Sequence, residues 1–288
     1  MGIRDRIRQE FAGLSPALEK IARYVLDHPG DVVTASMRTV AQRCDAKPPS
    51  LVRFAQHFGF DGWPPLKEAF AQDLGLSSRP YGERARGLVG RAKDETLLTE
   101  MFHTHLQNLQ ATERENRQSL QRACALLEKA RRVHVAGFRA CFPVAFSFVY
   151  VYRLFRPEVH LADAPGGALE MQLRAFAKGD AVLVISFNPY SREAVRTAQA
   201  AKAAGCTLIA MTDSAASPIS LVADATILFS TESPSFFPSV AAAVAISEGL
   251  LELLASRAGK AGVKRIHQSE SELRETGAYL PPNPAGAP

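Results

Sequence analysis

The spacing of apolar residues changes along the chain near residue 132. Before that point, apolar residues recur every three or four positions, as they do on one face of an amphipathic helix. After it, short runs of consecutive apolar residues, of which DAVLVIS at 180–186 is the clearest, alternate with segments of helical spacing. Such runs are typical of strands in a parallel sheet that is covered by helices on both faces. The pattern predicts an all-helical first part and an α/β second part.

A series of helices is expected in the first part, and two of them are short. The predicted ranges are 3–11, 16–27, 39–44, 51–58 and 61–74. The sequence DAKP at 45–48 separates the two short helices. In the second of these, an inward apolar stripe is expected at Leu51, Phe54, Ala55 and Phe58, and Gly59 stands where glycine commonly ends a helix.

Two short helices joined by a tight turn are typical of a helix-turn-helix. The outer face of the second helix carries hydrogen-bond donors in place of carboxylates. Its residues are Ser50, Arg53, Gln56 and His57. An ordinary helical hairpin with a solvated polar face is the alternative. Trp63, the lone tryptophan, is expected to be buried.

Residues 77–93 are rich in glycine, serine and arginine and show no sustained period, so an interdomain linker is expected there. A long helical segment should follow at 94–128, with a break near Asn116–Ser119. His103 and His105 on it would point in different directions and cannot ligate one metal ion together. The predicted domains are a helical domain at 1–76, an α/β domain at 94–258 and a C-terminal tail at 259–288 with a possible short helix at 264–275.

The second part is expected to alternate strands and helices. The predicted strands are 133–136, 158–161, 180–186, 206–211 and 225–229. The predicted helices are 140–155, 167–177, 191–204, 218–222 and 239–257. The fold class is therefore α + α/β, with an N-terminal all-helical domain and a C-terminal doubly wound parallel sheet.

Composition limits the kinds of partner and the cellular compartment that are expected for the chain. The chain has 288 residues and a formal net charge of +5, which permits a polyanionic partner without requiring one. Its four cysteines form no C-x-x-C pair, which favours reduced thiols in the cytoplasm over disulfides or a zinc site. They are Cys44, Cys124, Cys141 and Cys206. The most apolar segment, 133–155, contains Arg139 and Arg153, so a membrane span is not expected. The N-terminus lacks the apolar core of a signal peptide.

Three junctions between a strand and the next helix carry small or hydroxyl residues. They are Gly137–Cys141, Ser186–Ser191 and Ser233–Ser239. Ligands of open parallel sheets bind at such junctions, because free N–H groups and the helix dipole favour an anion. Simple capping by Ser191 and Ser239 is the alternative. Three junctions in one sheet favour a ligand pocket.

Two segments in this order resemble RpiR/MurR-type bacterial transcriptional regulators. They are PPSLVRFAQHFGFDGWPPLK at 48–67 and GDAVLVISFNPYSREAVRTAQAAKAAGCTLIAMTDSAASPISLVADATIL at 179–228. The resemblance extends over about residues 4–254. It implies an N-terminal helix-turn-helix and a C-terminal SIS (sugar isomerase) domain. It also implies binding to double-stranded operator DNA as a homodimer or dimer of dimers, controlled by a phosphorylated sugar or related anionic metabolite. No cofactor, metal or catalytic residue is expected.

The resemblance also assigns site residues. The recognition helix falls at about 49–58, and the residues expected to face DNA are Lys47, Ser50, Arg53, Gln56 and His57. The residues expected to bind the ligand are Gly137, Arg139, Cys141, Ser186, Asn188, Tyr190, Ser191, Ser235 and Ser239.

The chain departs from the family pattern in both ligand loops. Arg139 and Cys141 stand where SIS domains commonly have a glycine and a serine. The usual S-x-S-G-x-T loop reads SFNPYS at 186–191, which keeps the outer hydroxyls. Asn188 could donate its amide, and Arg139 a charge-assisted hydrogen bond to a phosphate or carboxylate. Lys47 replaces the usual serine cap and can reach a DNA phosphate. An anion site is retained, whereas a phosphosugar ligand is not assured.

The leading hypothesis is a ligand-responsive transcription factor. The rival class is a sugar-phosphate isomerase or lyase, which needs a general base near the substrate. Glu170, Glu193 and Glu248 are the available carboxylates, and each is expected to be a helix-surface charge. A sugar-binding module with no regulatory role is a third interpretation.

Overall fold

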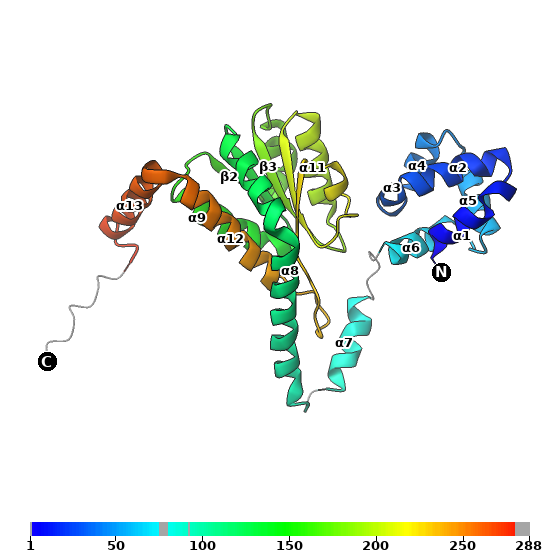
Figure 1. Ribbon diagram of the computed structural model, residues 1–288, viewed down its shortest axis with the longest axis horizontal. Coiled ribbons are helices and arrows are strands. Elements are labelled where there is room, and N and C mark those ends of the chain that lie inside the picture. Colours follow the sequence, from blue (N-terminus) through cyan, green and yellow to red (C-terminus); the bar gives the residue numbers. More distant parts are fainter. Residues whose placement is uncertain (1, 75–79, 92, 280–288) are drawn as a thin grey trace.

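The computed structural model describes residues 2–74, 80–91 and 93–279. It contains a group of helices formed by the N-terminal residues and an α/β domain formed by the C-terminal residues (Figure 1). This is the predicted fold class. The expected C-terminal segment LPPNPAGAP, 280–288, lies outside the described residues.

The helical domain has a single apolar core. Its helices are α1 (Ile3–Glu10), α2 (Pro16–Asp27), α3 (Pro29–Thr34), α4 (Met37–Arg43), α5 (Pro48–His57) and α6 (Trp63–Asp73). The predicted stripe of α5 is buried against this core, as is Trp63. Gly59 has a φ of 80°, which a glycine adopts without strain, and it follows α5 as predicted.

Helix α3 corrects the sequence analysis, which predicted no helix between the one at 16–27 and the one at 39–44. Pro29 starts α3 because proline fits the first turn of a helix, where its missing N–H is not needed. Val32 is fully buried in the core of the domain. Six residues are too few for the helical period to be recognised in the sequence.

The linker segment contains a helix that was not predicted, α7 (Tyr81–Val89). Tyr81, Arg84 and Leu88 are partly buried, whereas Gly82 and Gly87 are exposed. The partly buried positions have helical spacing, but the glycines between them are poor helix formers and hide the pattern.

Helix α8 (Thr96–Lys129) runs without the break expected near Asn116–Ser119. Asn116 is completely buried, and its side-chain amide pairs with both backbone groups of Leu228, accepting at 2.9 Å and donating at 2.6 Å. Thr112 accepts from the N–H of Ser230 at 3.0 Å, and Asn108 donates to the carbonyl of Glu232 at 2.8 Å. These polar residues, four apart along α8, therefore satisfy the backbone of a sheet edge.

A five-stranded parallel sheet forms the centre of the α/β domain, in the order β2-β1-β3-β4-β5. The strands are β1 (Val133–Gly137), β2 (Val159–Ala162), β3 (Ala181–Ile185), β4 (Thr207–Thr212) and β5 (Ala225–Leu228). Helices α8, α9 (Phe142–Arg153) and α12 (Ala241–Arg257) pack on one face. Helix α11 (Arg192–Ala203) packs on the other. The sheet is doubly wound, as predicted.

Shorter elements complete the domain. They are the 3-10 turns at Arg139–Cys141, Pro165–Gly167 and Ser220–Val222, and the helix α10 (Leu169–Arg174). After α12 the chain turns at Gly259 and forms α13 (Gly259–Glu275), which begins earlier than the predicted helix at 264–275.

Candidate functional site

Strands β1 and β3 are neighbours in the sheet, and the chain leaves them toward opposite faces. Helix α9, after β1, covers one face, whereas α11, after β3, covers the other. The strand order reverses at this point, and open α/β sheets bind their ligands in the crevice that results. The first two predicted ligand loops, 137–141 and 186–191, follow β1 and β3 and therefore lie at this switch point.

Gly137 ends β1 and lets the chain turn closely. A Cβ placed on Gly137 would lie 2.5 Å from the carbonyl oxygen of Cys141 and 2.8 Å from the Cβ of Ala145. Real Cβ atoms essentially never come that close to other atoms, so a glycine is required. Gly137 thus shapes the first loop and brings α9 near the end of the strand.

Arg139 has a φ of 55°, in the left-handed region that non-glycine residues rarely adopt. This is the position where the resemblance expected a glycine, and the backbone has kept the conformation that a glycine favours. Its side chain is 74% exposed, and Nη2 lies 3.2 Å from Oε1 of Glu193 at the start of α11. Strain of this kind, about 1–3 kcal/mol, is often found at functional sites.

The second loop is anchored by Asp213, which directly follows β4. The hydroxyl of Tyr190 donates to Asp213 Oδ1 at 2.9 Å, and the N–H of Asn188 donates to Oδ2 at 3.1 Å. Burial and the neighbouring Asp213 carboxylate raise the pKa of Tyr190, so its hydroxyl keeps its proton. Ser191 accepts from the N–H of Ala194 at 3.1 Å and caps α11. Sequence reasoning missed Asp213, although it comes shortly after the predicted strand at 206–211.

These loops enclose a cavity of about 420 Å³, called here the switch-point cavity. Five of the predicted ligand residues line it together. They are Arg139, Cys141, Ser186, Tyr190 and Ser191. The other lining residues are Tyr81, Phe138, Ala140, Phe187, Pro189, Arg192 and Phe237. Burial raises the pKa of the Cys141 thiol to about 12, so this group remains neutral. The cavity therefore combines hydroxyls, arginines and aromatic rings.

The third predicted junction, Ser233–Ser239, contributes to the switch-point cavity through an aromatic residue and not through its serines. Ser239 accepts from the N–H of Ala241 at 3.2 Å, and its hydroxyl lies 3.1 Å from Nδ1 of His105 on α8. The carbonyl of Ser235 accepts from Arg84 at 2.8 Å. Neither serine lines the switch-point cavity, whereas Phe237 between them does. Phe237 was missed because an aromatic residue in a loop gives no periodic signal, and Tyr81 because glycines hide the helical pattern of α7.

The three candidate carboxylates are scattered. Glu170 pairs with Arg196 at 2.5 Å on the surface, and Glu248 is exposed on α12. Glu193 is partly buried and touches Arg139 through Oε1, while its Oε2 is buried without a hydrogen-bond partner in the described part of the chain. Only Glu193 is therefore near the switch-point cavity.

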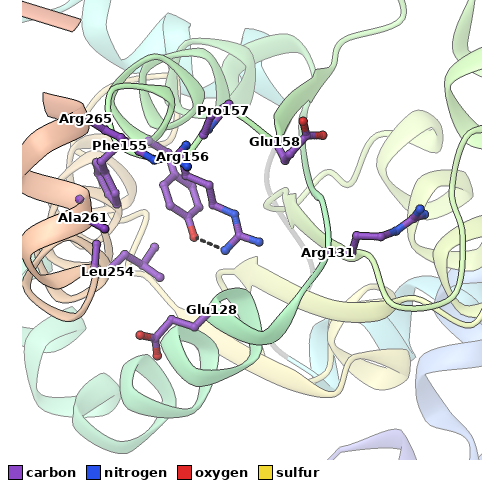
Figure 2. A pocket seen from close by; sticks show the side chains of 12 residues that line it. Glu128, Arg131, Phe155, Arg156, Pro157, Glu158, Leu254, Ala261 and Arg265 are labelled. Atoms are coloured by element: carbon purple, nitrogen blue, oxygen red, sulfur yellow. Dashed lines mark hydrogen bonds between the residues drawn. The ribbon is translucent and has the colours of Figure 1, made fainter. Parts of the chain in front are cut away.

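A second cavity, of about 550 Å³, lies where the last turns of α8 and α9 meet the start of α13 (Figure 2). Two of its three arginines, Arg156 and Arg131, already have partners. Arg156 donates to the Leu127 carbonyl at 2.9 Å, to the Ala130 carbonyl and to the Tyr152 hydroxyl, and Arg131 pairs with Asp180 at 3.3 Å. Arg156 thus closes the C-terminal end of α8, which gives this cavity a structural explanation.

In the helical domain, the predicted DNA-facing residues share the outer side of α5. Lys47, Arg53, Gln56 and His57 are exposed, and Ser50 is partly exposed. Arg53 Nη2 donates to the Ser50 hydroxyl at 3.4 Å, and His57 lies 3.6 Å from Glu10. Lys47 precedes α5 and makes no side-chain cap, as expected. The arrangement leaves these polar side chains on one exposed side of α5.

The α2–α4 corner is held by polar contacts. Arg43 Nη1 lies 2.6 Å from Asp31 Oδ2, and the Tyr24 hydroxyl donates to the same oxygen. Hydrogen bonds from Tyr24 and Arg43 outweigh the effect of burial and lower the pKa of Asp31. Arg43 thus acts within the domain, which separates it from the exposed cations of α5.

Two kinds of feature are absent from the residues that the structure describes. No helix in this part of the chain is long and apolar enough to cross a membrane. Over the same residues, no group of three or more His, Cys, Asp or Glu side chains is placed to hold a metal ion. The four cysteines are buried and free.

Comparisons with known proteins agree with this architecture. A family model described as a helix-turn-helix domain of the rpiR family matches residues 1–77, and a model described as the SIS domain matches residues 126–253. An uncharacterized HTH-type transcriptional regulator of Caldanaerobacter subterraneus subsp. tengcongensis is 27% identical over 235 residues, covering 80% of each chain. The HTH-type transcriptional regulator HexR of Pseudomonas aeruginosa is 25% identical over 217 residues, covering 75% of this chain and 74% of HexR.

Among solved structures, the Vibrio vulnificus NanR protein complexed with ManNAc-6P has a TM-score of 0.58. It is 17% identical, and the match covers 96% of this chain and 99% of NanR. At this identity the likeness concerns the fold. The helix-turn-helix of the rpiR type, followed by a SIS domain on a doubly wound parallel sheet, makes this chain a transcriptional regulator of the RpiR family.

Proposed function

We propose that the chain binds double-stranded operator DNA through the outer face of α5, and that an anionic metabolite in the switch-point cavity controls this binding. A phosphorylated sugar is the proposed class of metabolite. The observation that carries the proposal is that Arg139, Ser186 and Ser191 line one cavity at the point where the strand order reverses.

Charge and hydrogen bonding in the cavity favour such a ligand. Helix α11 has 12 residues and starts directly after Ser191, so its dipole and free N–H groups favour a negative charge there. Arg139 adds an exposed guanidinium, which suits a phosphate. Aromatic rings among the lining residues suit the apolar face of a sugar ring. NanR, which has a similar fold, is described in complex with ManNAc-6P.

DNA binding would follow the usual division of roles. Lys47 and Arg53 supply phosphate contacts, which provide affinity and position the domain. Gln56 is the residue proposed to read a base edge in the major groove. A homodimer would match a two-fold operator, with one helical domain on each half-site.

An exposed apolar stripe on α8 supports the proposed homodimer. Leu98, Phe102 and Leu106 are 66%, 63% and 59% exposed, and each lies four residues from the next. They therefore share one face of α8, in the part of the helix that extends beyond the sheet (Figure 1). A second copy of the chain is the proposed occupant of this stripe, because two such faces would bury each other as in a helical bundle.

A sugar-phosphate isomerase remains the second candidate function, and Glu193 is the observation that favours it. A carboxylate oxygen buried without a partner near a cavity is a possible general base. We favour regulation because Oε1 of this carboxylate is already paired with Arg139, and Glu170 and Glu248 lie on the surface. Isomerase assays on phosphosugars, with Glu193→Gln as the control, distinguish the two functions.

The direct test uses the purified full chain and a labelled fragment of the DNA upstream of its gene. Fluorescence anisotropy is measured with and without glucose 6-phosphate, arabinose 5-phosphate and N-acetylmannosamine 6-phosphate. Binding at nanomolar concentrations, shifted at least fivefold by one of these compounds, is the expected result. Operator affinity that stays unchanged at saturation with a compound that binds the chain would contradict metabolite control.

A further inference from the structure

Helix α7 belongs to the segment between the two matched family domains, yet it packs against the switch-point cavity. Tyr81, the first residue of α7, is one of the residues that line the cavity. Its ring lies 5.0 Å from the ring of Phe237, centroid to centroid. Phe237 lines the same cavity from the third junction. The linker therefore supplies part of the cavity wall.

Arg84, one helical turn further along α7, fixes this arrangement. Its Nη2 donates to the carbonyl of Ser233 at 3.2 Å and to the carbonyl of Ser235 at 2.8 Å. These two hydrogen bonds come from a charged donor to backbone acceptors, and bonds of this type contribute more than neutral ones. They hold α7 to the loop that carries Phe237.

The same loop is held from α8. Asn108 donates to the carbonyl of Glu232 at 2.8 Å, and His105 lies 3.1 Å from the Ser239 hydroxyl. Residues 232–239 thus contact both α7 and α8, and they also contribute Phe237 to the wall of the cavity. Along the chain, α7 stands between the helical domain and α8.

We infer that Tyr81 is a ligand-contacting residue and that a bound metabolite holds α7 against the loop at 233–239. The ligand class is a sugar phosphate whose phosphate lies at Arg139 and Ser191 and whose ring packs against Tyr81 and Phe237. The inference rests on the proposed function of the switch-point cavity. It adds that the cavity is incomplete without Tyr81, so that occupancy of the cavity and the position of α7 are coupled.

The physical reason is reciprocity. A ligand favours one position of α7 only through contacts that are absent from the other position. Tyr81 supplies such a contact, since it moves with α7 while Arg139 and Ser191 stay with the sheet. By the same linkage, a variant that releases α7 must lower the affinity of the chain for the ligand.

The test uses the full chain with four variants and two kinds of probe. Tyr81→Ala removes the ring, and Tyr81→Phe keeps it. Arg84→Ala removes the hydrogen bonds from α7 to the carbonyls of Ser233 and Ser235. Arg86→Ala is the matched control, because Arg86 is an exposed arginine on the same helix. Glucose 6-phosphate and N-acetylmannosamine 6-phosphate are the sugar probes, and inorganic phosphate is the probe too small to reach Tyr81.

Calorimetric titration is expected to show that Tyr81→Ala and Arg84→Ala weaken sugar-phosphate binding five- to tenfold. Tyr81→Phe and Arg86→Ala should bind like the wild type. Inorganic phosphate should bind all five proteins equally. Hydrogen exchange should show slower exchange of the amides of 81–89 when a sugar phosphate is bound to the wild type, and fast exchange in Arg84→Ala.

The outcomes separate this inference from the function on which it rests. If no probe binds the wild type, the proposed ligand class fails and this inference fails with it. If a sugar phosphate binds the wild type and binds Tyr81→Ala and Arg84→Ala equally well, the metabolite site stands and the role of α7 is refuted. An unchanged melting temperature of the variants shows that the α/β domain has kept its fold.

Discussion

Arg139 and Glu193 join the two ligand loops, with Nη2 of the arginine 3.2 Å from Oε1 of the glutamate. The arginine belongs to the loop after β1, and the glutamate to the first turn of the helix after β3. An anionic ligand in the switch-point cavity would compete with this carboxylate for the guanidinium. The pair therefore keeps a cation near the cavity while partly neutralising it.

The left-handed backbone of Arg139 gives the first prediction. Arg139→Gly should raise the free energy of unfolding by about 1 kcal/mol, because glycine adopts this φ without strain. Arg139→Gln keeps the strain and should not stabilise the protein. Both should weaken glucose 6-phosphate binding about tenfold if one charge-assisted contact is lost, since such a bond contributes about 1.5–3 kcal/mol. Urea unfolding measures the stability, and calorimetry measures the affinity for glucose 6-phosphate. If Arg139→Gln binds this ligand as tightly as the wild type does, Arg139 does not contact it.

Different roles are predicted for two residues of the DNA-facing surface. Gln56→Ala should weaken binding to the preferred sequence by about 1–3 kcal/mol and leave binding to random DNA unchanged. Lys47→Ala should weaken binding to both and reduce the slope of log affinity against log salt by about one. Anisotropy titrations at several salt concentrations, with operator and scrambled DNA, measure both. Equal losses on both DNAs for Gln56→Ala would show that Gln56 reads no base.

The exposed stripe of α8 gives a prediction about assembly. Phe102→Glu should halve the molar mass in light scattering after size exclusion, because a charge cannot be buried between two apolar faces without a partner. Gln107→Glu, at an exposed position of the same helix that lies away from the stripe, is the matched control and should leave the mass of the assembly unchanged. A wild-type mass for Phe102→Glu would place the dimer contact elsewhere.

Asp180 gives a pH-dependent prediction. Burial alone would raise its pKa, but hydrogen bonds from Arg132 and His134 and the charges of Arg132 and Arg131 outweigh burial and lower the pKa below the model-compound value of 3.8. A carboxyl whose pKa is lower in the folded state stabilises the fold above its unfolded pKa, and this contribution is lost as the pH falls through the folded pKa. Asp180→Asn should therefore cost about 2 kcal/mol at pH 7.

The same difference should shrink progressively as the pH falls below about 4, where the unfolded carboxyl takes up its proton. Urea unfolding of wild type and Asp180→Asn across this range measures it. A difference that does not vary with pH would mean that the ion pairs of Asp180 with Arg131 and Arg132 contribute little to folding.

Much of the fold follows from local pattern. The predicted strands and the main helices are present, with ends displaced by a few residues, because burial of one helix face or of a whole strand leaves a period that can be read in the sequence. The stripe from Leu51 to Phe58 is an example, since each of its four apolar residues is buried. Ser186 and Ser191, which line the switch-point cavity, were selected because ligand sites of parallel sheets follow strands.

The errors have a common physical cause. Asn116 reads as a helix breaker, yet α8 continues because the edge of β5, more than a hundred residues later, pairs with its amide. Tyr81 and Phe237 carry no periodic signal, and their contact depends on the path of the chain between them. A sequence pattern reflects only local preferences, and partners that are distant in the sequence can outweigh them.

The sequence by itself determined the two-part plan, the order of its elements, the outer face of α5 and the loops that follow β1 and β3. Only the tertiary structure decided which of these loops share a cavity and that the linker closes it. Period and capping depend on neighbours within a few residues, whereas a cavity depends on how strands are ordered in the sheet. That order, β2-β1-β3-β4-β5, separates α9 from α11 and opens the space between Arg139 and Ser191.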